Sequence, residues 1–174
     1  ASYNTAVGYN SLALNTTGAS HTAVGYQAGQ DITTAANGTY IGHQAGANIT
    51  TGNNNTAVGY GSLLTCTTGT PNVAIGINAL NSCNGAENVA VGPSCMVLAD
   101  SGAFYNTAVG STAGYDITSG DYNVVVGRYA GTTITTGSLN VCIGASAHPS
   151  AADSSHEIVL GYNVAGSGDS TFTF

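Results

Sequence analysis

The chain has 174 residues, of which 25 are glycine, three are phenylalanine and none is tryptophan, so a wide globular core is not expected and a thin fold with many turns fits better. Arg128 is the single basic residue against eight acidic residues, and the net charge is −7. This charge removes the main driving force for binding nucleic acid or an anionic membrane surface, and no apolar run is long enough to cross a bilayer.

A short segment that ends in a branched apolar residue and a glycine recurs ten times. Its glycines, called the marker glycines below, are Gly8, Gly25, Gly42, Gly59, Gly76, Gly92, Gly110, Gly127, Gly144 and Gly161. The interval from Gly8 to Gly25 repeats along the chain, except that the interval before Gly92 is one residue shorter and the interval after it is one residue longer. Such self-similarity is typical of one unit stacked on itself. The sequence therefore predicts an all-β solenoid, a β-roll or β-prism, of about ten 17-residue coils that occupies residues 1–174 as a single repeat domain.

The first element of each coil is a predicted β-strand that ends at the marker glycine. Counted from that glycine, position −1 is always Val, Ile or Leu, position −3 is always Thr, Val or Ile, and position −2 is most often Ala. Alternation of this kind predicts a strand. We expect the branched side chains at −1 and −3 to face the core and the small residue at −2 to face outward.

The second element is a shorter predicted strand six or seven residues after the glycine. Similar Ile-Thr-containing segments occupy residues 31–34, 48–51, 116–119 and 133–136, and a glycine turn usually follows. Stacking would bring together Thr33/Thr34, Thr50/Thr51, Thr67/Thr68 and Thr135/Thr136. Such a threonine grid resembles the surface of ice-binding β-solenoids, although Thr is also simply a good strand residue.

Position −4 is Asn in seven of the ten repeats: Asn4, Asn55, Asn72, Asn88, Asn106, Asn123 and Asn140. Stacked about 4.8 Å apart, their amides would hydrogen-bond along the column and cap the turn before each strand. A polar ligand array is the functional alternative.

The cysteines and histidines do not point to catalysis. Cys66 and Cys83 are one full repeat apart, so the stack would place them in neighbouring coils as either a disulfide or two buried thiols, while Cys95 and Cys142 occupy other positions. The richest polar cluster is His148, Asp153, His156 and Glu157, either a metal site or a solvated turn at the end of the stack. Its spacing matches no familiar site. We therefore predict a protein that is not an enzyme and that has no cofactor and no metal.

The rhythm breaks between Gly76 and Gly110, where residues 94–105 bring in Met96, Phe104 and Tyr105. Irregular insertions in solenoids tend to form protruding loops, and loops often carry binding residues. We predict these three as binding residues. The alternative is a locally wider core filled by larger side chains.

The repeats Asn-Thr-Ala-Val-Gly-Tyr at 4–9 and 55–60 resemble the repeat region of phage tail fibres. The segments at 72–76 and 88–92 are similar to the head repeat of trimeric autotransporter adhesins, whose coils are usually shorter than those expected here. Residues 157–163 resemble the closing segment of the tail-fibre repeats, so 148–174 is interpreted as a C-terminal closing segment. The resemblance implies a homotrimer, an extracellular location on a virion or bacterial surface, and attachment to a host-surface glycan or protein receptor.

A homotrimer is also expected because the core is thin. The small residues at −2 and a tyrosine column at +1 (Tyr9, Tyr26, Tyr60 and Tyr162) would bury against other copies. The primary prediction is a structural and adhesive segment of a phage tail fibre. A bacterial trimeric adhesin head and an ice-binding β-solenoid are the alternatives.

Overall fold

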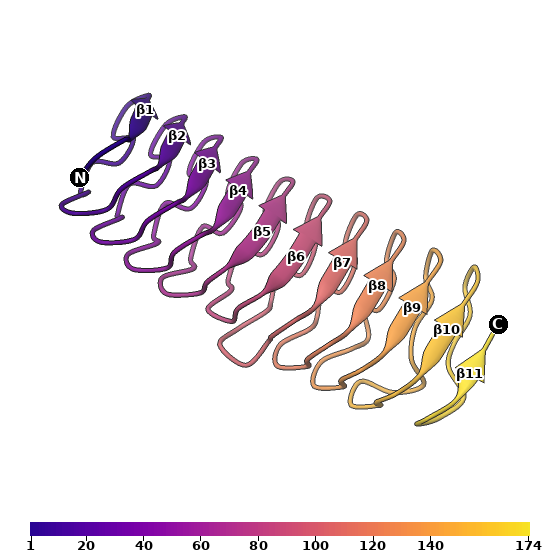
Figure 1. The fold of residues 1–174 in the computed structure, drawn as a ribbon. Helices are drawn as coiled ribbons and strands as arrows, with labels where there is room; N and C mark the ends of the chain where they lie inside the picture. Colours follow the sequence, from indigo (N-terminus) through magenta and orange to yellow (C-terminus); the bar gives the residue numbers. More distant parts are fainter.

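A computed structural model describes residues 1–174 as a rod of stacked coils without a helix (Figure 1). Each coil contributes one short strand, and eleven strands form a single parallel sheet in chain order. The strands are β1 (Thr5–Val7), β2 (Thr22–Val24), β3 (Thr39–Ile41), β4 (Thr56–Val58), β5 (Asn72–Ile75), β6 (Asn88–Val91), β7 (Thr107–Val109), β8 (Val124–Val126), β9 (Val141–Ile143), β10 (Ile158–Leu160) and β11 (Phe172–Thr173). The two termini lie at opposite ends of the rod (Figure 1). The predicted all-β solenoid is confirmed.

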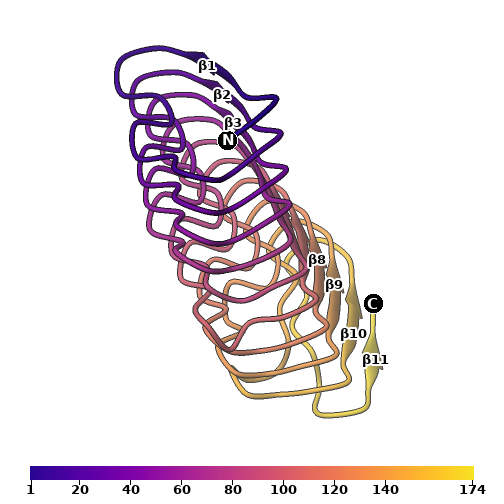
Figure 2. The ribbon, with the colours of Figure 1, turned by 60° about the vertical axis from the view of Figure 1, so that its left-hand side comes forward.

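The register of the sheet keeps equivalent positions of every coil in line. Thr5 pairs with Thr22, its counterpart in the next coil, and Thr22 pairs with Thr39 in the same way. The irregular intervals do not disturb this register. Asn72 of β5 pairs with Asn88 of β6, and Val89 of β6 pairs with Thr107 of β7. Equivalent side chains therefore form straight columns, and the turns of successive coils superpose (Figure 2).

The predicted orientation of the strand side chains is wrong. Position −2 faces the core in β2 to β10, and Ala23, Ala74 and Val125 are fully buried. Positions −3 and −1 face outward, so that Ile41 is 40% exposed. The interior of one coil is narrow, and side chains from the opposite wall already fill it. The position under the sheet therefore accepts mainly small residues, and the larger branched ones lie outside.

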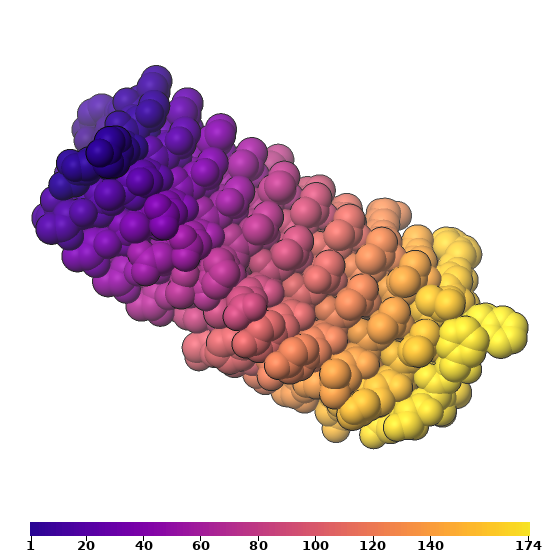
Figure 3. Space-filling model, in the orientation of Figure 1, coloured from indigo at the N-terminus to yellow at the C-terminus, as the bar shows by residue number.

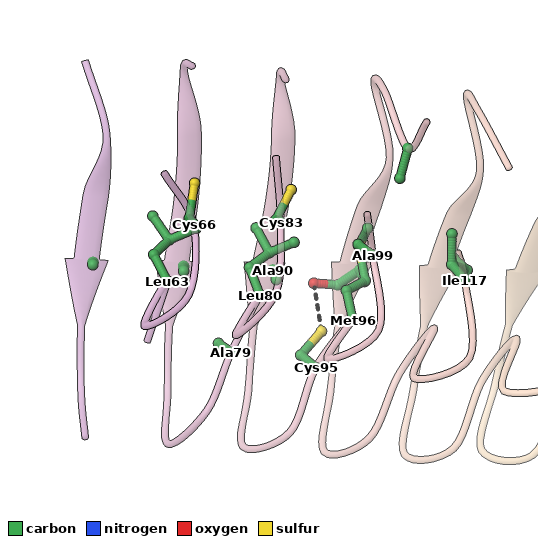
Figure 4. Close-up of a cluster of buried hydrophobic side chains, with 14 of the residues drawn as sticks. Leu63, Cys66, Ala79, Leu80, Cys83, Ala90, Cys95, Met96, Ala99 and Ile117 are labelled. Atoms are coloured by element: carbon green, nitrogen blue, oxygen red, sulfur yellow. Dashed lines mark hydrogen bonds between the residues drawn. The ribbon is translucent and has the colours of Figure 1, made fainter. Parts of the chain in front are cut away.

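The opposite wall fills the core in two alternative ways, at positions +4 and +7. Leu80 at +4 accompanies the smaller Cys83 at +7 (Figure 4). Gly114 at +4 accompanies the larger Ile117 at +7, and a Cβ on Gly114 would lie 2.9 Å from the Cδ1 atom of Ile117. Each coil thus keeps a similar core volume, as close packing requires.

The predicted second strand is absent, because the Ile-Thr segments form a turn. The backbone N–H groups of Thr33, Thr34 and Ala35 all donate to the carbonyl oxygen of Thr50 in the next coil, at 3.1 to 3.4 Å. The Thr33 hydroxyl donates to the same oxygen at 3.2 Å. Three consecutive N–H groups that converge on one acceptor cannot belong to a strand, in which successive N–H groups point in opposite directions.

The asparagine column at −4 forms a buried chain of hydrogen bonds, called the asparagine spine below. The Asn106 amide oxygen accepts from the backbone N–H of Asn123 at 2.9 Å and from its Nδ2 at 3.0 Å. The Nδ2 atom of Asn106 donates to the Asn88 Oδ1 atom at 3.2 Å and to the Gly120 carbonyl at 2.8 Å. The prediction that these amides bond along the column and cap the turns is confirmed.

The spine changes near both ends of the rod. In the third coil Gly38 stands at −4, and the ring of Tyr40 occupies the space beside it. At the other end Glu157 is fully buried at −4, and its carboxylate accepts from the Ser150 N–H at 3.0 Å and the Ser150 hydroxyl at 2.5 Å. The coil that follows is shorter than the others, since Ile158 pairs with Phe172, less than one full repeat later.

The marker glycines have a backbone conformation that other residues rarely adopt. Their φ angles lie between +127° and +141°. A Cβ on Gly110 would lie 2.5 Å from the Gly127 carbonyl oxygen of the next coil. Glycine is therefore required both for the turn and for the close approach of the coils.

Candidate functional site: the outer sheet face

The two outward columns of β1 to β10 form one continuous surface, called the outer face below. Its −3 column consists of Thr5, Thr22, Thr39, Thr56, Val73, Val89, Thr107, Val124, Val141 and Ile158, and its −1 column of Val7, Val24, Ile41, Val58, Ile75, Val91, Val109, Val126, Ile143 and Leu160. No residue in either column is charged. The space-filling view shows regular rows of side chains along the rod (Figure 3).

The outer face has two chemically different halves. In β1 to β4 a threonine at −3 stands beside a valine or isoleucine at −1, and this part is called the Thr/Val half. From β5 to β10 both columns are aliphatic except at Thr107. Because neighbouring strands are in register, each half repeats its chemistry from strand to strand.

An aromatic ladder follows the +1 edge of the Thr/Val half. The rings of Tyr9 and Tyr26 stack with their centroids 5.5 Å apart, and His43 stacks between Tyr26 and Tyr60 at 4.9 and 5.1 Å. Ring faces thus cover one another and ring edges meet the solvent. The association of these tyrosines with other copies stays a prediction.

Formal charge is almost absent from the borders of the outer face. Position −5 carries one acidic residue, Glu87, and position +1 carries one basic residue, Arg128. The Arg128 guanidinium lies 4.3 Å from the centre of the Tyr129 ring and donates to the Tyr129 hydroxyl. The other acidic side chains lie outside these four columns.

The three predicted binding residues do not converge. Met96 is fully buried at position +4, in the core beside Ala99 (Figure 4), and has no exposed surface to offer a ligand. Phe104 is half-buried, and Tyr105 is exposed and stacks on Tyr122 with their centroids 4.7 Å apart. Met96 is thus part of the core, as the alternative to a binding loop expected, and the smaller Ala99 at +7 balances its volume. Binding by Phe104 and Tyr105 stays a prediction.

The electrostatics of this second aromatic group are simple. The Glu87 carboxylate raises the pKa of the Tyr105 hydroxyl, and the neighbouring Tyr122 adds to this effect. The Tyr105 hydroxyl therefore stays neutral at physiological pH.

The predicted threonine grid is not a flat surface. Its first threonines use their hydroxyls within the rod, as Thr50 does by donating to the Thr67 carbonyl at 3.1 Å. The second threonine of each pair, such as Thr34, is exposed, whereas the first is partly buried except at Thr67. The threonines that lie on β-strands in register are instead Thr5, Thr22, Thr39 and Thr56 of the outer face.

The four cysteines are free and buried, and Cys66 and Cys83 form no disulfide. Burial raises the pKa of Cys66 to about 11 and the pKa values of Cys83, Cys95 and Cys142 to about 12. Thiols of this kind are poor nucleophiles at neutral pH.

The structure brings together no group of three His, Cys, Asp or Glu side chains that could hold a metal ion. Of the predicted cluster, Asp153 and His156 are exposed, and the Glu157 carboxylate accepts a hydrogen bond from the Ser150 hydroxyl. His148 is half-buried, and desolvation lowers its pKa. The surface has no pocket, and the chain has no helix that could cross a bilayer.

Comparison with protein-family models, with curated proteins and with solved structures finds no match to this chain. The outer face is therefore the candidate site on geometric grounds alone.

Proposed function

We propose that this chain is a non-enzymatic structural and attachment segment of an extracellular fibre, of the phage tail-fibre kind, and that the outer face makes the contact. One observation carries the proposal: a single parallel ladder runs without interruption between termini at opposite ends of a rod and leaves an uncharged sheet face open along its length.

The rod suits a spacing role because its contacts are uniform. Each coil bonds to the next through the sheet, and the asparagine spine and the threonine turns add two further lines of hydrogen bonds. In such one-dimensional repeats stability comes from contacts between neighbouring repeats, so length can be extended without changing the cross-section.

The outer face suits an attachment role because it is apolar, extensive and free in the single chain. Val7 is 57% exposed and Ile143 is 42% exposed, at opposite ends of the same column. Contiguous exposed apolar surface on this scale marks an interaction site in soluble proteins.

One of the reasons for proposing a homotrimer does not hold in the structure. The small residues at −2, which were expected to meet other copies, are enclosed within one chain, which therefore closes its own core. The Tyr9–Tyr60 ladder, the thin core and the resemblance to tail-fibre repeats are the reasons that remain. Light scattering on the purified chain would reveal the number of copies.

The attachment proposal is tested by binding the fluorescently labelled chain to an array of bacterial surface glycans and to intact bacteria. We expect binding that Val91→Glu, in the middle of the outer face, largely abolishes. The matched variant Thr51→Glu, exposed on a turn outside the outer face, should bind like the wild type. Binding to neither target, or equal binding by both variants, would contradict the proposal.

A further inference from the structure

We propose that the Thr/Val half of the outer face binds ice. This inference rests on the proposed function only in taking the outer face as the contact surface, and it names the class of surface contacted: an ordered lattice of water. The residues that carry it are not the threonines predicted from the sequence.

The outward side chains of the Thr/Val half form a regular grid. Thr22 pairs with Thr39 and Val24 with Ile41, so that each column repeats at the strand separation of about 4.8 Å. The two columns are two residues apart along the strand, or about 6.6 Å. The threonine and aliphatic side chains therefore repeat in two directions, as the water molecules on a face of an ice crystal do.

The threonine side chains of this half are held in place, but their hydroxyls make no hydrogen bond within the chain. β-branched side chains have few χ1 rotamers, and the ladder fixes the backbone beneath them. The hydroxyls of Thr22, Thr39 and Thr56 make no hydrogen bond within the chain, in contrast to that of Thr33 in the turn. Each of these threonines therefore presents a free hydroxyl beside a methyl group.

Charged side chains are absent from the Thr/Val half and its borders. Neither outward column is charged, and the flanking positions of β1 to β4 are Tyr, Ser, Asn and one His. A charged side chain would orient nearby water around itself and oppose lattice order, and none is present at this half of the face.

The uniformity of the Thr/Val half favours a periodic partner over a protein. Protein interfaces concentrate their binding energy in a few aromatic or Arg anchors that enter pockets. The Thr/Val half has neither a protruding anchor within its two columns nor a pocket. A repeating surface without anchors or pockets is complementary to another repeating surface.

The test is thermal hysteresis and partition into growing ice, measured on the purified chain. We expect the wild type to shape ice crystals, to depress the freezing point below the melting point, and to enrich in the ice fraction. Thr22→Lys, in the second strand of the Thr/Val half, should remove most of both effects. Thr34→Lys is the matched control, because it adds the same charge to an exposed turn of the same coil.

Two further variants keep the test decisive. Thr22→Val removes the hydroxyl but keeps the shape, so it should lower the hysteresis, though less than Thr22→Lys does. Val126→Lys adds a charge to the aliphatic half and should retain most of the wild-type hysteresis. Both variants should keep the wild-type circular dichroism. Ordinary ice growth in the presence of the wild type, or equal hysteresis for Thr22→Lys and Thr34→Lys, would overturn the inference. Binding to glycans or bacteria without any effect on ice would overturn it while the attachment proposal stands.

A crystalline polysaccharide is the competing lattice. The inference would also be overturned if the wild type bound cellulose or chitin but did not partition into ice, and if Thr22→Lys abolished that binding. Partition into ice without such binding would support it.

Discussion

Replacement of Asn106 by alanine tests whether the asparagine spine holds the coils together. Asn106 is almost completely buried, and its side chain takes part in four hydrogen bonds. Removal of its amide leaves two backbone groups without the partners they now have, the N–H of Asn123 and the carbonyl of Gly120. A buried polar group without a partner costs about 1–3 kcal/mol, so we expect Asn106→Ala to lower the free energy of unfolding by about 2–6 kcal/mol.

Denaturant unfolding followed by circular dichroism measures this loss, and amide hydrogen exchange locates it. In a one-dimensional repeat the effect should concentrate in the coils that contain Asn106 and Asn123. Asn48→Ala is the control, because Asn48 is exposed and its side chain makes no hydrogen bond, so a change within about 0.5 kcal/mol is expected. A loss below about 1 kcal/mol for Asn106→Ala, or faster exchange spread evenly along the rod, would refute the reasoning.

Three other predictions concern the core and the turns. Tyr40→Phe should leave stability unchanged or raise it by about 1 kcal/mol in thermal unfolding, because the buried Tyr40 hydroxyl has no hydrogen-bond partner. Leu80→Gly should create a cavity and Cys83→Ile should overpack the same coil, and each should lower the free energy of unfolding by about 1–5 kcal/mol. The double variant has the Gly/Ile arrangement of other coils, so a double-mutant cycle should show a smaller loss than the sum of the two single losses. Burial raises the pKa of the Cys83 thiol to about 12, so native protein should resist alkylation at pH 8, and the free energy of unfolding should fall above about pH 9, where the unfolded thiol ionises and the folded one does not.

The repeat alone predicted a large part of the fold. Ten marker glycines at nearly constant spacing indicated the stack, the short strands before them and the register, because a fixed period places equivalent residues in line. The asparagine spine was predicted for the same reason, since a column of amides at strand spacing can bond only along the column. The outer face was present in the same alternation, but it was assigned to the core.

One signal in the sequence could have located the interior. Wherever position +4 is glycine in the regular coils, position +7 is isoleucine, as in Gly114 and Ile117, and where +4 is leucine or methionine, +7 is smaller, as in Leu80 and Cys83. Two positions that exchange volume in this way lie in one closed space, and little room then remains for branched side chains from the strand. The buried role of Met96 follows from the same pattern.

The sequence by itself determined that the chain stacks into coils, where each strand lies and which residues form columns, because these features depend only on period. The strand alternation by itself did not determine which side of the strand faces inward, because it separates two faces without identifying the buried one. The tertiary structure decided this. That choice depends on the space left by the opposite wall of the coil. The same wall directs the branched residues outward and creates the surface on which both proposals depend.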